Sequence, residues 1–317
     1  MSSTSLIGLA DVEAAAARIV GTCVRTPLLC LAEADSFWVK PESLQPTGAF
    51  KLRGATNAVA VLSAQERARG VVTHSSGNHG QALAYAARRA GVACTVVMPD
   101  GSPAIKVDAT RGYGADVRLV PVEQRDAECA RIAADTGYAV VPPFDDARII
   151  AGQGTVGLEI AADLPELATV LVPVGGGGLI SGVAAAVKAS APRARVIGVE
   201  PELAGDAAAG FAAGERAAWS EADTGRTAAE GLRSPQVGDL NWAHIHALVD
   251  DIVTVTEEEI RDAARLLVAR GRLVVEASGA VATAAQVAGR LDRRPGPVVA
   301  IVSGGNADPA WLTGLWR

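Results

Sequence analysis

The chain has 317 residues, is 49% hydrophobic and carries a formal net charge of −6. This length allows two domains or one large α/β unit, and the acidic balance gives no general attraction for nucleic acid or an anionic membrane surface. No run of about 18 apolar residues is free of charges and turn formers, so we expect no segment to cross a membrane.

The first half of the chain predicts a helix over residues 11–20, a short strand over 37–39, and then a run of alternating elements. Strands that alternate with helices indicate a parallel sheet with helices on both faces. Pro142 and Pro143 end this run. The expected helices cover residues 55–62, 81–90, 103–111 and 123–136, and the expected strands cover 71–73, 95–98, 117–120 and 138–141.

A second series follows in the other half of the chain. A capping box, Thr256 to Glu259, opens one of its helices. The segment 205–236 is polar and rich in glycine, and it predicts no clear element. The expected helices cover residues 149–162 and 178–189, and the expected strands cover 170–174, 196–199, 252–255 and 297–302.

One lysine lies in a setting suited to chemistry. Lys51 stands between Phe50 and Leu52 on a segment bounded by Gly48 and Gly54. Apolar surroundings remove solvation from an ammonium group and lower its pKa, which provides the free amine that forms a Schiff base with an aldehyde. The alternative is a surface lysine at the start of a helix. The chain has only three other lysines, Lys40, Lys106 and Lys188, and none has this setting.

Two loops follow expected strands, at the edge where open α/β sheets bind ligands. Residues 75–80, Ser-Ser-Gly-Asn-His-Gly, suit a carboxylate at a helix N-terminus, although an ordinary N-cap explains them equally well. Residues 175–178 are four glycines, whose N–H groups can converge on a phosphate. A dinucleotide site is the rival, with Glu200 at the end of the next strand, but no register gives G-x-G-x-x-G, so a single phosphate fits better.

Three further patterns are weaker. Ser303 begins a Ser-Gly-Gly-Asn turn, and its hydroxyl could bond a ring nitrogen. Residues 200–206 begin and end with a carboxylate and include a free carbonyl, a set that would suit a hard cation, although a solvated acidic loop is the simpler interpretation. His244 and His246 alternate as on a strand, with no third metal ligand in view, and are interpreted as structural.

In this order, the lysine, the Asn-containing loop, the glycine tetrad and the terminal serine resemble the fold type II pyridoxal-phosphate enzymes, in the branch of serine racemases and serine/threonine dehydratases. The resemblance covers nearly the whole chain, from Val24 to Asn306. It implies an α/β fold of two domains, each with a mostly parallel sheet: a discontinuous large domain of residues 1–61 and 146–317, and a small domain of residues 62–145.

The resemblance also implies site residues. Lys51 would carry pyridoxal 5′-phosphate, Asn78 would contact its ring hydroxyl, and Ser303 its ring nitrogen. The phosphate would be bound by Gly175, Gly176, Gly177 and Gly178. Ser75, Ser76 and His79 would surround the substrate carboxylate, with Ser76 also a candidate second acid, while Arg125 and Ser234 would lie near the substrate side chain. Glu200, the Ala204 carbonyl and Asp206 would bind Mg²⁺ or Ca²⁺. The resemblance thus favours a cation site over the solvated acidic loop that the residues alone suggested.

The implied activity is that of an ammonia-lyase, which converts L-threonine or L-serine to 2-oxobutyrate or pyruvate plus ammonia. Serine racemase and 3-hydroxyaspartate dehydratase are alternatives, and a non-catalytic nucleotide-binding protein is the alternative from another class. The first ten residues have no basic start and no long apolar run, and the four cysteines form no CxxC pair. We therefore expect a cytoplasmic homodimer with no signal peptide, a small amino acid as its partner, and no nucleic acid or membrane partner.

Overall fold

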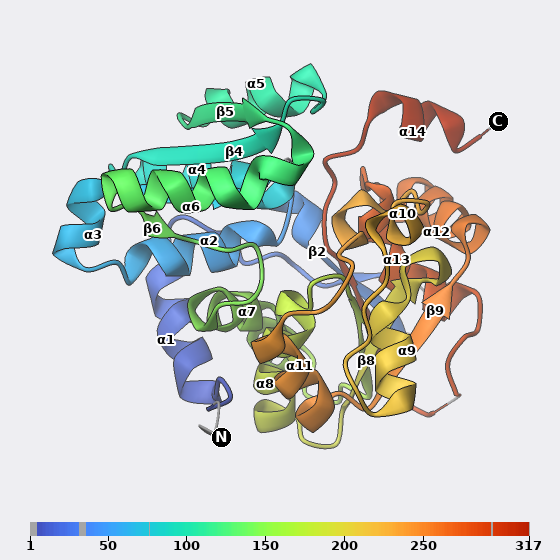
Figure 1. Ribbon diagram of the computed structural model, residues 1–317. Coiled ribbons are helices and arrows are strands. Elements are labelled where there is room, and N and C mark those ends of the chain that lie inside the picture. The colour runs from blue at the N-terminus through green and yellow to red at the C-terminus, as the bar shows by residue number, and fades with distance from the viewer. Residues whose placement is uncertain (1–4, 32–35, 76, 293, 317) are drawn as a thin grey trace.

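The computed structural model describes residues 5–31, 36–75, 77–292 and 294–316, and its helices and strands form two stacked units (Figure 1). The large unit is built on a six-stranded sheet of order β1-β2-β10-β7-β8-β9, in which only the β1–β2 pair is antiparallel. Its strands are β1 (Leu29–Cys30), β2 (Phe37–Pro41), β7 (Thr169–Pro173), β8 (Arg195–Pro201), β9 (Asp251–Val255) and β10 (Val298–Val302).

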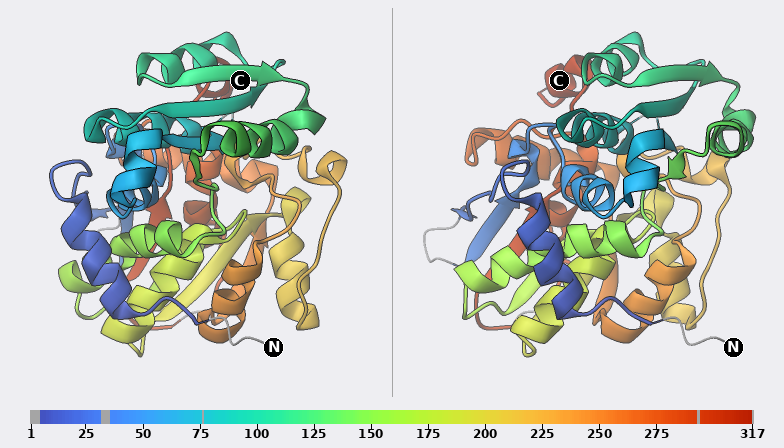
Figure 2. Two further views of the ribbon diagram at one scale, coloured as in Figure 1. Left: turned by 60° about the vertical axis from the view of Figure 1, so that its left-hand side comes forward. Right: turned by 90° about the vertical axis from the view of Figure 1, so that its left-hand side faces the viewer.

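Helices cover both faces of this sheet (Figure 2). On one face, α12 and α13 bury Ile260, Leu267 and Val281 against the strands. On the other face, α7, α8 and α11 bury Ile160, Ile180 and Ile245. The helices of the large unit are α1 (Leu9–Ile19), α7 (Ala147–Asp163), α8 (Gly178–Ser190), α9 (Asp206–Ala213), α10 (Glu221–Thr224), α11 (Asp239–Leu248), α12 (Glu257–Ala269), α13 (Ala277–Val287) and α14 (Pro309–Gly314).

The small unit has a four-stranded parallel sheet of order β5-β4-β3-β6. Helix α4 packs on one face and α6 on the other. Its strands are β3 (Val71–His74), β4 (Cys94–Pro99), β5 (Asp116–Val120) and β6 (Ala139–Val140), and its helices are α3 (Ala64–Arg69), α4 (Asn78–Ala90), α5 (Ala104–Gly112) and α6 (Arg125–Thr136).

Helix α2 (Lys51–Ala60) lies between the two units. Its residues Leu52, Ala55 and Val59 belong to the hydrophobic core that also contains α4. On the side facing α7, Gly54 leaves room for Gln153, because a Cβ at Gly54 would lie 2.4 Å from the side-chain nitrogen of Gln153. The domain boundaries near residues 61 and 145 stay a prediction.

The expected α/β architecture is present, and so is each strand whose range was expected, with ends that differ by at most two residues. The prediction that His244 and His246 lie on a strand is wrong, because both lie in α11. Their spacing of two residues is too short to define a period. Within the described part of the chain, no helix is long and apolar enough to span a membrane.

Candidate active site

The candidate site lies where the carboxyl ends of the two sheets meet. The loops after β3 and β6 come from the small unit, and those after β7, β8 and β10 come from the large unit. Two backbone hydrogen bonds join the segment before α2 to the loop after β10. Phe50 N–H donates to the Ser303 carbonyl over 3.0 Å, and Gly305 N–H donates to the Gly48 carbonyl over 2.8 Å. The start of α2 is therefore held at this junction.

Lys51 is the first residue of α2, and its amine lies at the centre of the junction. Its Nζ donates to the carbonyl oxygen of Pro143, after β6, over 2.7 Å. Burial lowers the pKa of the Lys51 ammonium group to about 8. The other three lysines pair with carboxylates, Lys40 with Glu159, Lys106 with Glu230 and Lys188 with Asp250. Among the described residues Lys51 has no such partner, so no carboxylate offsets the loss of hydration that lowers its pKa.

The glycine loop runs from the end of β7 into α8. Gly177 has a φ of +91°, which favours glycine. A Cβ at Gly176 would lie 2.2 Å from the Phe144 ring, so a side chain does not fit there. Within the described part of the chain, no acceptor pairs with the N–H groups of Gly176, Gly177 and Gly178. The loop therefore presents free donors at a helix N-terminus, the arrangement that binds phosphate.

Asn78 and Ser303 lie on either side of this junction. Asn78, the first residue of α4, donates from Nδ2 to Glu276 Oε1 over 2.7 Å and accepts from Asn306 Nδ2 over 2.8 Å. Ser303 is buried and its hydroxyl donates to the Ser278 carbonyl over 3.3 Å. Ser303 supplies a hydroxyl and no charge to a ligand beside it.

Glu276 is a site residue that the sequence did not reveal. Burial raises the pKa of its carboxyl group to about 7, and the hydrogen bond from Asn78 partly offsets this. Although Glu276 precedes α13, its side chain makes no cap there. A Cβ at Gly304 would lie 2.2 Å from Glu276 Oε1, which shows how closely the loop after β10 approaches it. Only the fold brings this acid to Asn78.

The loop after β3 holds the predicted carboxylate site. Ser75 is half-buried and its hydroxyl accepts from Gly77 N–H over 3.3 Å. Ser76 lies outside the described residues. His79 is buried, and Nε2 lies 3.0 Å from the Val141 carbonyl. Because burial lowers its pKa to about 3, the imidazole is neutral, with the proton on Nε2 and an unpaired acceptor at Nδ1.

Arg125 and Ser234 lie near a cavity between the two units. Arg125 begins α6, donates from Nε to the Val122 carbonyl over 2.9 Å, and lies 3.6 Å from Glu221 of the large unit. Ser234 is half-buried. The cavity has a volume of about 460 Å³. Its lining includes Val122 and Glu123, close to Arg125 in the chain, and Arg233, next to Ser234, together with Lys106 and Glu230.

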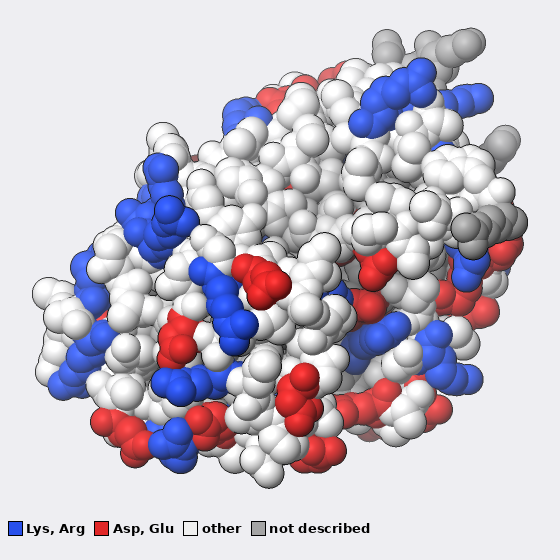
Figure 3. Space-filling model, turned by 90° about the horizontal axis from the view of Figure 1, so that it is seen from above, with Lys and Arg blue, Asp and Glu red and all other residues white. Residues whose placement is uncertain are grey.

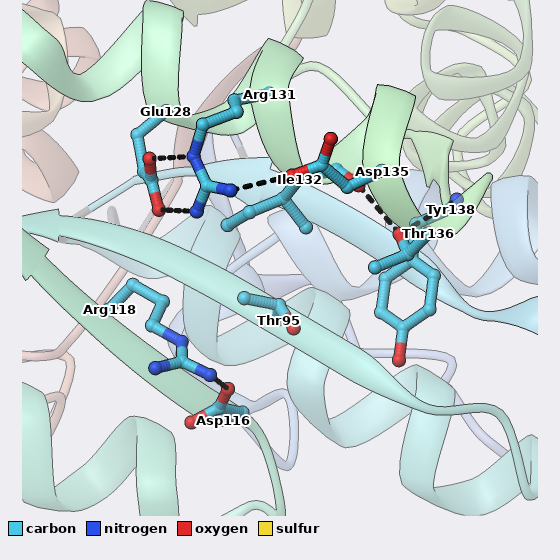
Figure 4. A pocket seen from close by; sticks show the side chains of 9 residues that line it. All are labelled: Thr95, Asp116, Arg118, Glu128, Arg131, Ile132, Asp135, Thr136 and Tyr138. Carbon is cyan, nitrogen blue, oxygen red and sulfur yellow. Dashed lines mark hydrogen bonds and ion pairs between the residues drawn. The ribbon is translucent and has the colours of Figure 1, made fainter.

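A second cavity, of about 290 Å³, lies on the small unit (Figure 4). Thr95 and Asp116 line it from the starts of β4 and β5, the opposite edge of the sheet from the loop after β3. Arg131 there pairs with Glu128 and Asp135. Arg118 pairs with Asp116 in the same cavity, so the charged side chains of its lining pair with one another. This cavity is separate from the candidate active site.

The predicted cation ligands lie after β8. Glu200 is buried, and its carboxylate accepts N–H groups from Ala207 over 3.2 Å and Ala208 over 2.7 Å. Both side-chain oxygens of buried Asp206 lack a hydrogen-bond partner. Burial raises the pKa of both acids, that of Asp206 to about 7, and the Asp206 charge adds to the effect on Glu200. A bound cation would offset the free-energy cost of burying these two negative charges, and carboxylate oxygens are ligands that Mg²⁺ and Ca²⁺ accept.

The described residues contain no group of three or more His, Cys, Asp or Glu side chains suited to a metal. A third ligand for the Glu200 and Asp206 pair would therefore come from a carbonyl, and buried Ala204 is the predicted one. The structure leaves this cation as a prediction.

Comparison with known proteins gives consistent matches. A family model described as pyridoxal-phosphate dependent enzyme matches residues 21–304. The chain is 42% identical over 311 residues to a Thermotoga maritima protein named L-threonine ammonia-lyase, covering 96% of this chain and 76% of that protein. It is 39% identical over 319 residues to an Oryza sativa subsp. indica protein named serine racemase, covering 97% and 92%. A crystal structure of serine racemase from Dictyostelium discoideum matches with a TM-score of 0.88 at 36% identity, covering 96% of this chain and 100% of that one.

Proposed function

Because this chain belongs to the pyridoxal-phosphate dependent enzyme family, we propose that it is an ammonia-lyase acting on L-threonine or L-serine. The products are 2-oxobutyrate or pyruvate, plus ammonia. The observation that carries the proposal is the Lys51 amine, which has a lowered pKa, no carboxylate partner among the described residues, and a hydrogen bond to Pro143, the residue before the Phe144 ring that packs against the glycine loop. Family membership leaves the nucleotide-binding alternative without support.

The residues present fit pyridoxal 5′-phosphate. The glycine loop offers unpaired N–H groups to its phosphate, Asn78 an amide to its ring hydroxyl, and Ser303 an uncharged hydroxyl to its ring nitrogen. When bound, the cofactor delocalises the electron pair left at the substrate α-carbon after deprotonation. Lys51 would hold the cofactor through its side-chain amine, and the same amine, when free, would take the α-proton of the substrate. Ser75 and the N–H groups at the start of α4 hold the substrate carboxylate.

The names of the relatives favour threonine or serine over 3-hydroxyaspartate, because one relative is named L-threonine ammonia-lyase and another serine racemase. The test is an assay of the protein loaded with pyridoxal 5′-phosphate (PLP). Threonine, serine and 3-hydroxyaspartate are supplied as substrates, and the release of ammonia and of the 2-oxo acid is measured. Absence of turnover with both threonine and serine would contradict the proposal.

Serine racemisation is a second candidate activity, because the rice relative named above is a serine racemase by name. Racemisation needs a second acid on the ring face opposite Lys51, and Ser76 is the predicted group. The measurement is formation of D-serine from L-serine, followed separately from pyruvate.

The proposal includes a Mg²⁺ or Ca²⁺ ion bound by Glu200, the Ala204 carbonyl and Asp206, supported by the unpaired Asp206 oxygens. It also includes a cytoplasmic location, supported by a sequence in which the four cysteines form no CxxC pair. Acidic and basic side chains are interspersed on the face shown in Figure 3, which supports a small molecule rather than nucleic acid as the partner. A homodimer is also part of the proposal, and sedimentation would test it.

A further inference from the structure

Consecutive residues of the loop after β6 contact different parts of the candidate active site. The Pro143 carbonyl accepts from Lys51, and the Phe144 ring fills the space beside Gly176. Asp145 is the next residue, and its carboxylate turns toward the start of α11. None of these contacts is local in the sequence.

The Asp145 carboxylate satisfies the N-terminus of α11. Oδ2 accepts from Asp239 N–H over 3.1 Å, and Oδ1 accepts from Leu240 N–H over 3.0 Å and from Asn241 N–H over 3.4 Å. These are N–H groups that a helix start leaves without a partner of its own. A Cβ at Gly238 would lie 2.4 Å from Asp145 Oδ1, so the carboxylate is closely fitted to this helix start.

Helix α11 in turn binds the glycine loop. The Gly176 carbonyl oxygen accepts from Gly238 N–H over 3.1 Å and from Asn241 Nδ2 over 2.9 Å. In a planar trans peptide the carbonyl and the following N–H point in opposite directions. Fixing the Gly176 carbonyl toward α11 therefore directs the N–H of Gly177 away from α11, on the side where the loop has free donors.

We propose that Asp145 is a positioning residue for the cofactor phosphate. It holds α11 in the place from which Gly238 and Asn241 orient the Gly176–Gly177 peptide. This inference rests on the proposed function, which puts the phosphate of pyridoxal 5′-phosphate at the glycine loop.

The test compares the apoprotein's affinities for pyridoxal 5′-phosphate and for pyridoxal, which lacks the phosphate. In Asp145→Asn an NH₂ group replaces one acceptor oxygen that faces the N–H groups of α11. We expect the affinity for pyridoxal 5′-phosphate to fall about tenfold, the order lost with a charge-assisted hydrogen bond. The affinity for pyridoxal should stay within about twofold, because Asp145 acts through the phosphate loop.

Asp239→Asn is the matched control. It removes the same charge from the same helix start, but the Asp239 side chain pairs with Arg216 and is 81% exposed. It should leave both affinities unchanged. Asn241→Ala should lower the affinity for pyridoxal 5′-phosphate as Asp145→Asn does. In the double variant the two losses should not add, because both residues act on the same peptide. Asn241→Ala alone serves as the test if Asp145→Asn does not fold.

Equal losses for both ligands, or an unchanged affinity for pyridoxal 5′-phosphate, would overturn the role of Asp145. Failure of the wild-type protein to bind pyridoxal 5′-phosphate would instead contradict the proposed function.

Discussion

The Lys51 amine and the Pro143 carbonyl oxygen are 2.7 Å apart, and this hydrogen bond joins the start of α2 to the loop after β6. The bond uses one of the three ammonium protons and brings no negative charge. Because no carboxylate among the described residues stabilises the charged form, the loss of hydration dominates and the pKa falls.

The first prediction concerns the pH at which this amine becomes reactive. Burial lowers the Lys51 pKa from 10.5 to about 8, so the reactive neutral form should predominate above pH 8 and diminish below it. The measurement is the rate at which an acylating reagent modifies Lys51 in the apoprotein between pH 6 and pH 11, followed by mass spectrometry. Lys188, which pairs with Asp250, is the internal control. A midpoint for Lys51 at or above its ordinary value of 10.5 would be inconsistent with the environment described.

The second prediction concerns the glycine loop. In Gly176→Ala the added methyl group would lie 2.2 Å from the Phe144 ring, so the ring or the loop must move. Such overpacking costs about 1–3 kcal/mol, and here it displaces the phosphate donors. We expect weaker binding of pyridoxal 5′-phosphate in an equilibrium titration. Gly112→Ala, where a Cβ meets nothing within 4 Å, is the control. Equal affinities in the two variants would refute a role for residue 176.

The third prediction concerns the cation. A ligand that binds only the folded state, present at 100 times its Kd, stabilises that state by about 2.7 kcal/mol. Added Mg²⁺ or Ca²⁺ should therefore raise the melting temperature of the EDTA-treated protein. Asp206→Asn should abolish this response because it removes a charge from the buried pair. A melting temperature that does not respond to either cation would show that the site is absent.

The fourth prediction concerns Ser76. If this serine supplies the second proton in racemisation, Ser76→Ala should lose D-serine formation from L-serine while pyruvate formation continues. The two products are measured separately by chiral chromatography and a coupled assay. If the wild-type protein forms no D-serine, or the variant forms as much, Ser76 is not the second acid.

Much of the fold could be predicted from the sequence because its parallel strands are short, apolar and separated by helices. The glycine loop and Lys51 were found for a similar reason, since a run of glycines and a lysine between apolar residues are local signals. Helix α9, at residues 206–213, was not predicted, because a run of alanine and glycine carries no periodicity.

The contacts that complete the site depend on residues far apart in the chain. The carboxylate at the start of α11 comes from Asp145, 94 residues before Asp239, so no local capping pattern marks this helix. Glu276 reaches Asn78 across 198 residues. Such pairings follow from the packing of the two units and leave no local trace.

The central claim is that Lys51 binds the cofactor covalently, and reduction of the PLP-loaded protein with borohydride, followed by peptide mapping, tests it most directly. Reduction fixes the cofactor to whichever amine holds it. The account predicts that the phosphopyridoxyl mass lies on the peptide that contains Lys51, and that Lys51→Ala lacks both this mass and the visible absorbance of the bound cofactor. A label on Lys40, Lys106 or Lys188 in the wild-type protein would contradict the account.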